Sequence, residues 1–218
     1  MQVISSRRRY ITALWLAPLV LSACAHATPP GTHDATAHPV AAEPSAQLAL
    51  RDLWVEHVFW IRGYVFASHN QQPAAAKAAE AEVVENARAI ADAIIPFYGQ
   101  AAADQLFALL AGHWGAVKGF NHATLQASPS AQQSAIATIT ANARQIAQFL
   151  SSANPHLPEQ AVFDLLAVHG QHHVEQIEQV AADQFTAEAR TWHAMRTHML
   201  VIADALATAL ARQFPGKA

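Results

Sequence analysis

Two series of polar residues recur through this sequence at a fixed step of 56 residues. The first series is His57, His113 and His169, and the second is Asn86, Asn142 and His198. Neutral imidazoles on facing helices are suitable ligands for Zn²⁺ or Cu. We therefore predict a metal site, holding zinc or copper, whose ligands are His57, His113, His169 and His198. Asn86 and Asn142 are expected to orient these ligands by hydrogen bonding.

The elements that position these residues are predicted to be helices. Between a few Pro- and Gly-containing turns, apolar residues recur at helical spacing. This pattern predicts an all-α, up-and-down bundle of six helices, built from three tandem αα-hairpins with repeats at about 47–98, 103–154 and 159–214. The first helix is expected around 50–65, and the others at about 74–97, 101–126, 130–152, 159–183 and 187–213.

The two series are predicted to meet in one layer halfway along the bundle. Within each hairpin, the two series members are equally far from the turn, and such residues lie at the same height in an up-and-down bundle. His113 follows Leu109 and Leu110, which places it on an apolar, core-facing stripe. Each buried polar group left without a partner costs about 1–3 kcal/mol, so the layer needs a ligand or internal hydrogen bonds.

Three functions are compatible with such a layer. The first is non-enzymatic binding of a metal ion or small ligand. The second is a structural or protein-interaction module whose polar layer only sets helix register. The third is a metal-dependent enzyme, which needs an open coordination position and a nearby acid or base. Glu56 is a poor candidate for this base, because it directly precedes His57 and adjacent positions on a helix point about 100° apart.

Three further residues are secondary candidates for the site: His173, Met195 and Met199. His173 follows His169 by one helical turn and could share its metal, but we expect His172 and His173 to face solvent with the glutamates that follow. The two methionines flank His198 and would suit Cu(I), although methionine on such a stripe is commonly core.

The N-terminus predicts export and a lipid anchor. Three arginines at positions 7–9 precede an apolar run that is too short to span a membrane and ends at Cys24. This predicts a lipoprotein signal peptide over 1–23, lipidation of Cys24, and a disordered tether over 24–46 that contains His26, His33 and His38. The protein is expected in the cell envelope, on the outer membrane facing the periplasm. Both general secretory and twin-arginine export remain open.

Composition limits the functions that remain open to the domain over residues 47–218. After the predicted signal peptide, residues 24–218 contain 10 basic and 16 acidic residues, a net charge of −6, so we expect no nucleic-acid partner. No cysteine follows Cys24, which excludes internal disulfides and thiolate metal sites in this domain. The sequence also lacks the Gly-rich and nucleophile motifs of nucleotide-binding proteins and hydrolases.

Several motifs resemble a group of uncharacterised bacterial helical-bundle proteins. They are Leu53-Trp54-x-x-His57-x-x-Trp60-x-Arg62, Pro96-Phe97-Tyr98-Gly99, Asn142-Ala143-x-x-Ile146-Ala147-x-Phe149-Leu150-Ser151 and Gln213-Phe214-Pro215. The resemblance spans most of residues 50–215 and implies the helical fold without an agreed activity. Some such proteins carry a glycosyltransferase label, but this sequence has no pattern for a nucleotide-sugar fold.

Overall fold

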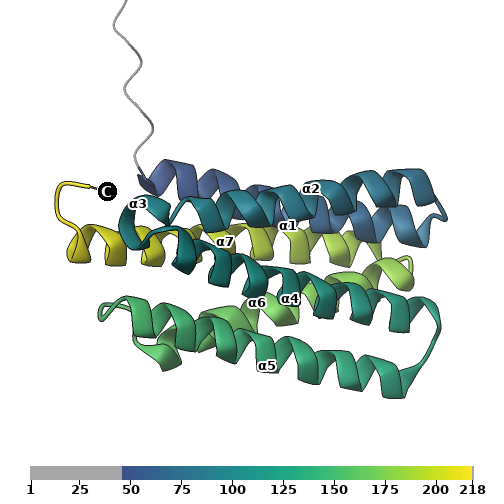
Figure 1. The fold of residues 1–218 in the computed structure, drawn as a ribbon. Coiled ribbons are helices and arrows are strands. Elements are labelled where there is room, and N and C mark those ends of the chain that lie inside the picture. The colour runs from purple at the N-terminus through teal and green to yellow at the C-terminus, as the bar shows by residue number, and fades with distance from the viewer. Residues whose placement is uncertain (1–45, 218) are drawn as a thin grey trace, which may run out of the picture. The chain divides into compact units, whose positions relative to one another are not determined.

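The protein folds as an all-α bundle, in agreement with the sequence prediction. The computed structural model describes residues 46–217, and the predicted signal peptide, Cys24 and the tether lie outside them. The described residues contain no β-strand. The helices are α1 (Ala46–His69), α2 (Pro73–Asp92), α3 (Ile95–Tyr98), α4 (Gln100–Leu125), α5 (Pro129–Ala153), α6 (Glu159–Ala181) and α7 (Phe185–Gln213), and the long ones run side by side (Figure 1).

The long helices form a closed arrangement in which α1, α4 and α6 carry the predicted histidines of the first series. Helix α2 contacts both α1 and α4, α5 contacts both α4 and α6, and α7 contacts both α6 and α1. Helix α6 also contacts α1 and α4 directly. The second helix of each hairpin therefore lies against its own partner and the first helix of a neighbouring hairpin.

The three hairpin turns have the same backbone geometry. In each, one residue adopts a left-handed conformation and the next residue donates its N–H to a carbonyl five positions earlier, which is the Schellman pattern for ending a helix. The left-handed residues are Gln71, Ala127 and Asp183, at φ values of 54°, 48° and 55°. Proline occupies the first turn of the following helix in the first two hairpins, where its missing N–H leaves no bond unmade.

The helix expected over 74–97 is interrupted. Helix α2 ends at Asp92, and the four-residue helix α3 begins at Ile95 with Pro96 in its first turn. A proline inside a helix removes one backbone hydrogen bond and its ring collides with the carbonyl four residues earlier, here that of Asp92. As a result, a two-residue turn and the four-residue helix α3 follow α2 where one continuous helix is predicted.

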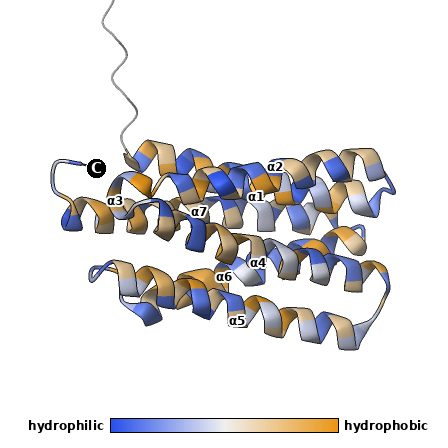
Figure 2. Ribbon diagram, in the orientation of Figure 1, coloured by the Kyte–Doolittle hydropathy of each residue, from blue (hydrophilic) through white to orange (hydrophobic). Residues whose placement is uncertain are grey.

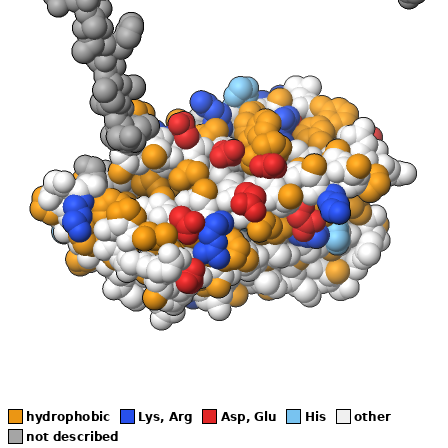
Figure 3. Space-filling view, turned by 45° about the horizontal axis from the view of Figure 1, so that its top comes forward, with side chains coloured by type: hydrophobic (Ala, Val, Ile, Leu, Met, Phe, Trp, Pro, Cys, Tyr) orange, Lys and Arg blue, Asp and Glu red, His pale blue; other side chains and the backbone are white. Residues whose placement is uncertain are grey.

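Hydrophobic and hydrophilic residues are interspersed along every long helix (Figure 2), and the hydrophobic ones supply most of the buried side chains. The largest apolar cluster is centred on residues such as Leu50, Ile90, Leu106 and Met199 at one end of the bundle, and a second surrounds Ile61 and Phe120 at the other. On the face shown in Figure 3, acidic and basic side chains are interspersed with small apolar areas. Helix α7 is long and apolar enough to cross a membrane, but core helices share these properties, and α7 packs against α1 and α6.

A partly buried ion pair joins the C-terminal half of α1 to the first turn of α7. Arg62 on α1 binds both carboxylate oxygens of Glu188 on α7, with Nη2 2.7 Å from Oε2. Gln176 on α6 donates to the same carboxylate at 2.9 Å, and Glu188 is only 1% exposed. Since removing one member of such a pair leaves a buried charge, this contact fixes α1, α6 and α7 relative to one another.

Candidate metal centre

Four histidines meet inside the bundle. His57 on α1, His113 on α4, and His169 and His173 on α6 each offer a ring nitrogen, and these nitrogens all lie within 4.8 Å of one another. All four side chains are buried. The first three are the 56-residue series, which α1, α4 and α6 bring to the same height.

The cluster has the shape of a triangle with a fourth ring one helical turn away. The ring centres of His57, His113 and His169 are 5.2–6.0 Å apart. His173 stands one turn further along α6, with its ring centre 4.4 Å from that of His169, 5.6 Å from His113 and 6.4 Å from His57. Three nitrogens in a layer and one beyond it match the arrangement of a tetrahedral site.

Most of the imidazole nitrogens in the cluster have no hydrogen-bond partner within the described chain. Both ring nitrogens of His57 are buried and unpartnered, as are Nε2 of His113 and the Nδ1 atoms of His169 and His173. The one contact inside the group joins Nε2 of His169 to Nε2 of His173 at 3.1 Å. Unsatisfied groups of this kind cost about 1–3 kcal/mol each, so the layer is poorly explained as an internal hydrogen-bond network.

Burial keeps all four histidines neutral. Loss of solvation lowers the pKa of His57 to about 3, and the neighbouring His113 adds to the shift. Desolvation also lowers the pKa of His113 to about 4. The pKa values of His169 and His173 fall well below the ordinary value, because of burial and then the other imidazoles. Each ring consequently keeps a free lone pair at neutral pH, which metal binding requires.

The spacing is close to that needed by one ion. With metal–nitrogen bonds of about 2.0–2.1 Å, the nitrogens of a tetrahedral site lie about 3.3 Å apart. The contact between His169 and His173 is 3.1 Å, and the other ligand atoms fall within 4.8 Å. Side-chain rotation would have to close a remaining gap of at most about 1.5 Å between ligand atoms.

The second series forms a hydrogen bond that recurs in all three hairpins. Asn86 Nδ2 donates to the Leu53 carbonyl and Asn142 Nδ2 to the Leu109 carbonyl, both at 3.0 Å. His198 Nε2 makes the equivalent contact with the Leu165 carbonyl at 2.8 Å. Each accepting residue lies one turn before a histidine of the first series. These bonds join the two helices of a hairpin directly beside the cluster.

Asn86 and Asn142 also lie against the cluster itself. Their Oδ1 atoms are buried and have no hydrogen-bond partner of good geometry. The amide of Asn86 opposes part of the pKa depression of His57, and that of Asn142 does the same for His113. An amide oxygen facing an imidazole favours an N–H on that side of the ring, and the orienting role of the two asparagines stays a prediction.

His198 does not join the four histidines, contrary to the ligand set expected from the sequence. Its Nε2 is engaged with the Leu165 carbonyl, and its ring centre lies 5.6 Å from that of His172, on the outer side of α6. The distance of His198 from the turn predicts its position along the bundle. It does not determine on which side of the layer the ring lies. His173 occupies the fourth place.

The expectation that His172 and His173 face solvent is wrong for His173, which is fully buried, while His172 is half-buried. Helix α6 contacts four other long helices and therefore has a wide buried surface. One sequence signal could have revealed this. Stepping back from His173 by 56 and 112 residues leads to Val117 and Ile61, which are both core residues.

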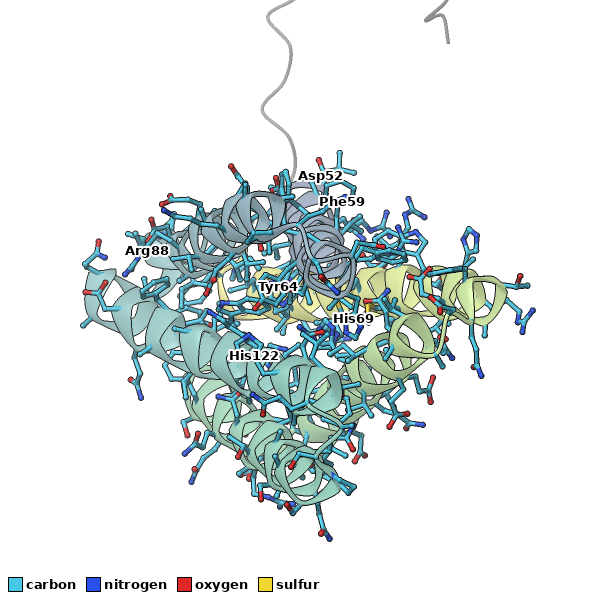
Figure 4. All side chains as sticks on the ribbon, turned by 90° about the vertical axis from the view of Figure 1, so that its right-hand side faces the viewer. Asp52, Phe59, Tyr64, His69, Arg88 and His122 are labelled. Carbon is cyan, nitrogen blue, oxygen red and sulfur yellow. The ribbon has the colours of Figure 1, made fainter. Side chains whose placement is uncertain are left out.

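The remaining candidates lie outside the cluster. Met195 and Met199 are fully buried in the apolar cluster between α7 and its neighbours. Glu56 is exposed, with its carboxylate near Trp60 Nε1 and Asn86 Nδ2, each at 3.3 Å. At the end of the bundle facing the viewer in Figure 4, His122 contacts Tyr64 and His69 contacts Asn121, away from the four histidines.

A small cavity lies on one side of the histidine triangle. It has about 10 Å³ of room and is lined by His57, His113 and His169 but not by His173. The other lining residues are Trp54, Leu110, Ala143, Ile146 and Leu166. This volume is near the smallest that can hold one water molecule. The triangle is therefore covered by His173 on one side and open to a small space on the other.

Comparison with models of known protein families, with curated proteins and with solved structures gives no match for this chain.

Proposed function

We propose that this protein binds one transition-metal ion through His57, His113, His169 and His173. The observation that carries the proposal is the convergence of four buried, largely unpartnered imidazoles whose ligand atoms lie within 4.8 Å of one another. A bound ion would replace the missing hydrogen bonds of the ring nitrogens. It would also offset the free energy lost when the rings are buried.

Zinc or copper is the expected metal. An all-imidazole set favours borderline ions such as Zn²⁺ or Cu²⁺ over the oxygen-seeking Mg²⁺ and Ca²⁺. Zinc has no geometric preference of its own and accepts the tetrahedral arrangement that three layered rings and His173 provide. Met195 and Met199 belong to the apolar core and add no soft ligand.

The site favours binding over turnover. Among the described residues that line the cavity beside the triangle, none is acidic, so a metal-bound water would have no carboxylate base there. Together with the predicted signal peptide and lipidated Cys24, this supports a tethered lipoprotein that captures or senses a metal at the cell envelope.

The proposal can be tested on the chain without its signal peptide, carrying Cys24→Ser and no polyhistidine tag. The three tether histidines, His26, His33 and His38, are replaced by alanine so that loose binding does not count. We expect close to one equivalent of Zn²⁺ or Cu²⁺ per chain by elemental analysis. At a hundredfold excess over the Kd, the ion should stabilise the fold by about 2.7 kcal/mol, seen as a higher Tm.

Two variants separate a metal centre from a structural polar layer. His113→Leu should abolish the stoichiometric ion, whereas the exposed His193→Ala should leave it unchanged. If neither ion raises the Tm of the starting protein, and His113→Leu is simply more stable, the layer only sets helix register and the proposal is wrong.

A further inference from the structure

A larger apolar chamber adjoins the histidine triangle. It has about 60 Å³ of room and is lined by residues from all six long helices. Trp54, Leu110, Ile146 and Leu166 line both this chamber and the small cavity beside the histidines. The chamber therefore begins on the side of the triangle that His173 does not cover.

The chamber is built from the same 56-residue steps as the cluster. Its walls contain five sets of three residues at this spacing, with one member of each set from each hairpin. The sets are Leu50, Leu106 and Val162; Trp54, Leu110 and Leu166; Ile90, Ile146 and Ile202; Ile94, Leu150 and Leu206; and Tyr98, Asn154 and Leu210. The chamber therefore has walls from all three hairpins and, through the small cavity, adjoins the place where His57, His113 and His169 converge.

The walls determine what can occupy this space. They are almost entirely aliphatic or aromatic. At the far end Asn154 donates to the Tyr98 hydroxyl at 3.0 Å, and that hydroxyl donates to Gln213 at 2.7 Å. At the histidine end the indole N–H of Trp54 is buried and has no partner among the described residues. Apolar cavities of this kind stay dry, and they bind xenon or small hydrocarbons when large enough. A charged or strongly hydrated ligand would lose its solvation and gain at most the single N–H of Trp54 in return.

We infer that the chamber binds a small nonpolar molecule, of the dioxygen class, and holds it against the open side of the histidine cluster. The inference has two halves: the first is binding of the molecule in the chamber, and the second is its contact with a metal ion. Only the second half rests on the proposed metal site. Binding in the chamber requires the apolar walls alone, while contact with a metal requires an ion held by the four histidines. A molecule in the chamber would approach such an ion from the side opposite His173.

Xenon is the probe for the first half, because it is inert and nonpolar. We expect the metal-free chain to show a saturable xenon-dependent ¹²⁹Xe shift and local changes in the methyl signals of Leu50, Leu106 and Val162. Val162→Phe should fill the chamber and weaken xenon binding at least about tenfold. Ala205→Leu is a milder substitution in the same chamber, for the case that Val162→Phe impairs folding. It should also weaken xenon binding.

The matched control is Val201→Phe, the same substitution at an exposed site on α7 that does not line the chamber. This variant should bind xenon as the starting protein does. Absence of saturable xenon binding, or equal binding by Val162→Phe, Ala205→Leu and Val201→Phe, would overturn the inference. Because this measurement uses metal-free protein, its result does not depend on the metal proposal.

The second half is tested by loading the site with Co²⁺ in place of diamagnetic Zn²⁺. Xenon held beside the cluster should relax much faster in the cobalt protein than in the zinc protein, and Val162→Phe should remove the difference. Equal relaxation with both ions, at full metal occupancy, would show that the chamber ligand does not face the metal. Failure of either ion to bind would count against the proposed metal site and leave the xenon result in place.

Discussion

The third hairpin, α6 and α7, differs from the first two in the residues it brings to the cluster. At three positions near the cluster it carries histidine where the other hairpins carry other residues, and a fourth such histidine, His193, is exposed. His173 corresponds to Ile61 and Val117, and His198 corresponds to Asn86 and Asn142. His172 corresponds to Trp60 and Ala116. The first two hairpins contribute one ligand each, while the third contributes two.

The differences at His198 and His173 have unlike consequences. His198 does the same work as asparagine, since its N–H reaches the Leu165 carbonyl just as Asn86 and Asn142 reach Leu53 and Leu109. His173 replaces an apolar core residue by a metal-binding group. An arrangement with three equivalent hairpins can offer three imidazoles, and only a departure from equivalence supplies the fourth ligand of a tetrahedral site.

The largest effect is expected when this departure is reversed. His173→Val gives the third hairpin the residue of the second and should weaken metal binding by at least about a hundredfold, more than the loss usually seen for an outer partner of a ligand. The metal-free protein should become more stable, because a buried ring with an unpartnered nitrogen is removed. Titration calorimetry and thermal unfolding measure the two effects. Unchanged affinity would contradict the assignment of His173 as a ligand.

A smaller loss of metal affinity is expected when a hairpin loses the hydrogen bond from its asparagine side chain. Asn142→Ala removes the hydrogen bond to the Leu109 carbonyl and the amide oxygen facing His113. Metal affinity should fall by about 10–100-fold, the usual range for a group that orients a ligand. Competition with a chelator of known affinity measures this change. An affinity equal to that of the starting protein would show that the amide has only a packing role.

Stability of the metal-free protein should decrease as the pH falls below about 6.5. The four histidines have pKa values depressed by burial, so the unfolded chain binds protons before the folded chain does. The stability that these histidines contribute is therefore fully present above the pKa of histidine in the unfolded chain. It is lost as the pH falls towards their pKa values in the folded protein, about 3 for His57 and about 4 for His113. Each histidine contributes a slope of about 1.4 kcal/mol per pH unit in this window.

The pH dependence also sharpens the comparison of hairpins. His173→Val has one such histidine fewer, so its slope between pH 6.5 and 5 should be shallower by about 1.4 kcal/mol per pH unit. Denaturant unfolding at several pH values, with a chelator present, measures both slopes. Parallel slopes would indicate that His173 is not buried in its neutral form.

The smallest effect is expected for His198→Asn. Asparagine is the residue of the other two hairpins at this place and can donate the same bond to the Leu165 carbonyl. Metal affinity should remain unchanged and the free energy of unfolding should change by less than about 0.5 kcal/mol, as for substitutions that keep all partners. Loss of the metal in this variant would return His198 to the ligand set.

The fold and most of the site follow from residue spacing, and the exceptions have identifiable causes. Helical periodicity and the placement of turns predict the bundle, and equal distance from each turn predicts that His57, His113 and His169 share one layer. Spacing fixes the height of a residue but not the direction of its ring, which is why His198 was expected among the ligands. His173 is placed only among the secondary candidates because the glutamates after it indicate a solvent-facing surface, whereas α6 contacts four other long helices.

The break between α2 and α3 has a local cause that periodicity does not detect. Apolar residues continue through this segment at helical spacing, but Pro96 cannot continue the helix that ends at Asp92. The chamber is a different case. Its residues read as ordinary core in the sequence, and only the packed structure reveals that their side chains leave the axis partly empty.

X-ray absorption spectroscopy of the zinc-loaded protein, with the tether histidines removed, tests the central claim most directly. The account predicts one zinc ion per chain with four imidazole nitrogens at about 2.0–2.1 Å, and fewer imidazoles in His173→Val. A spectrum dominated by oxygen ligands, or one that His173→Val leaves unchanged, would contradict it.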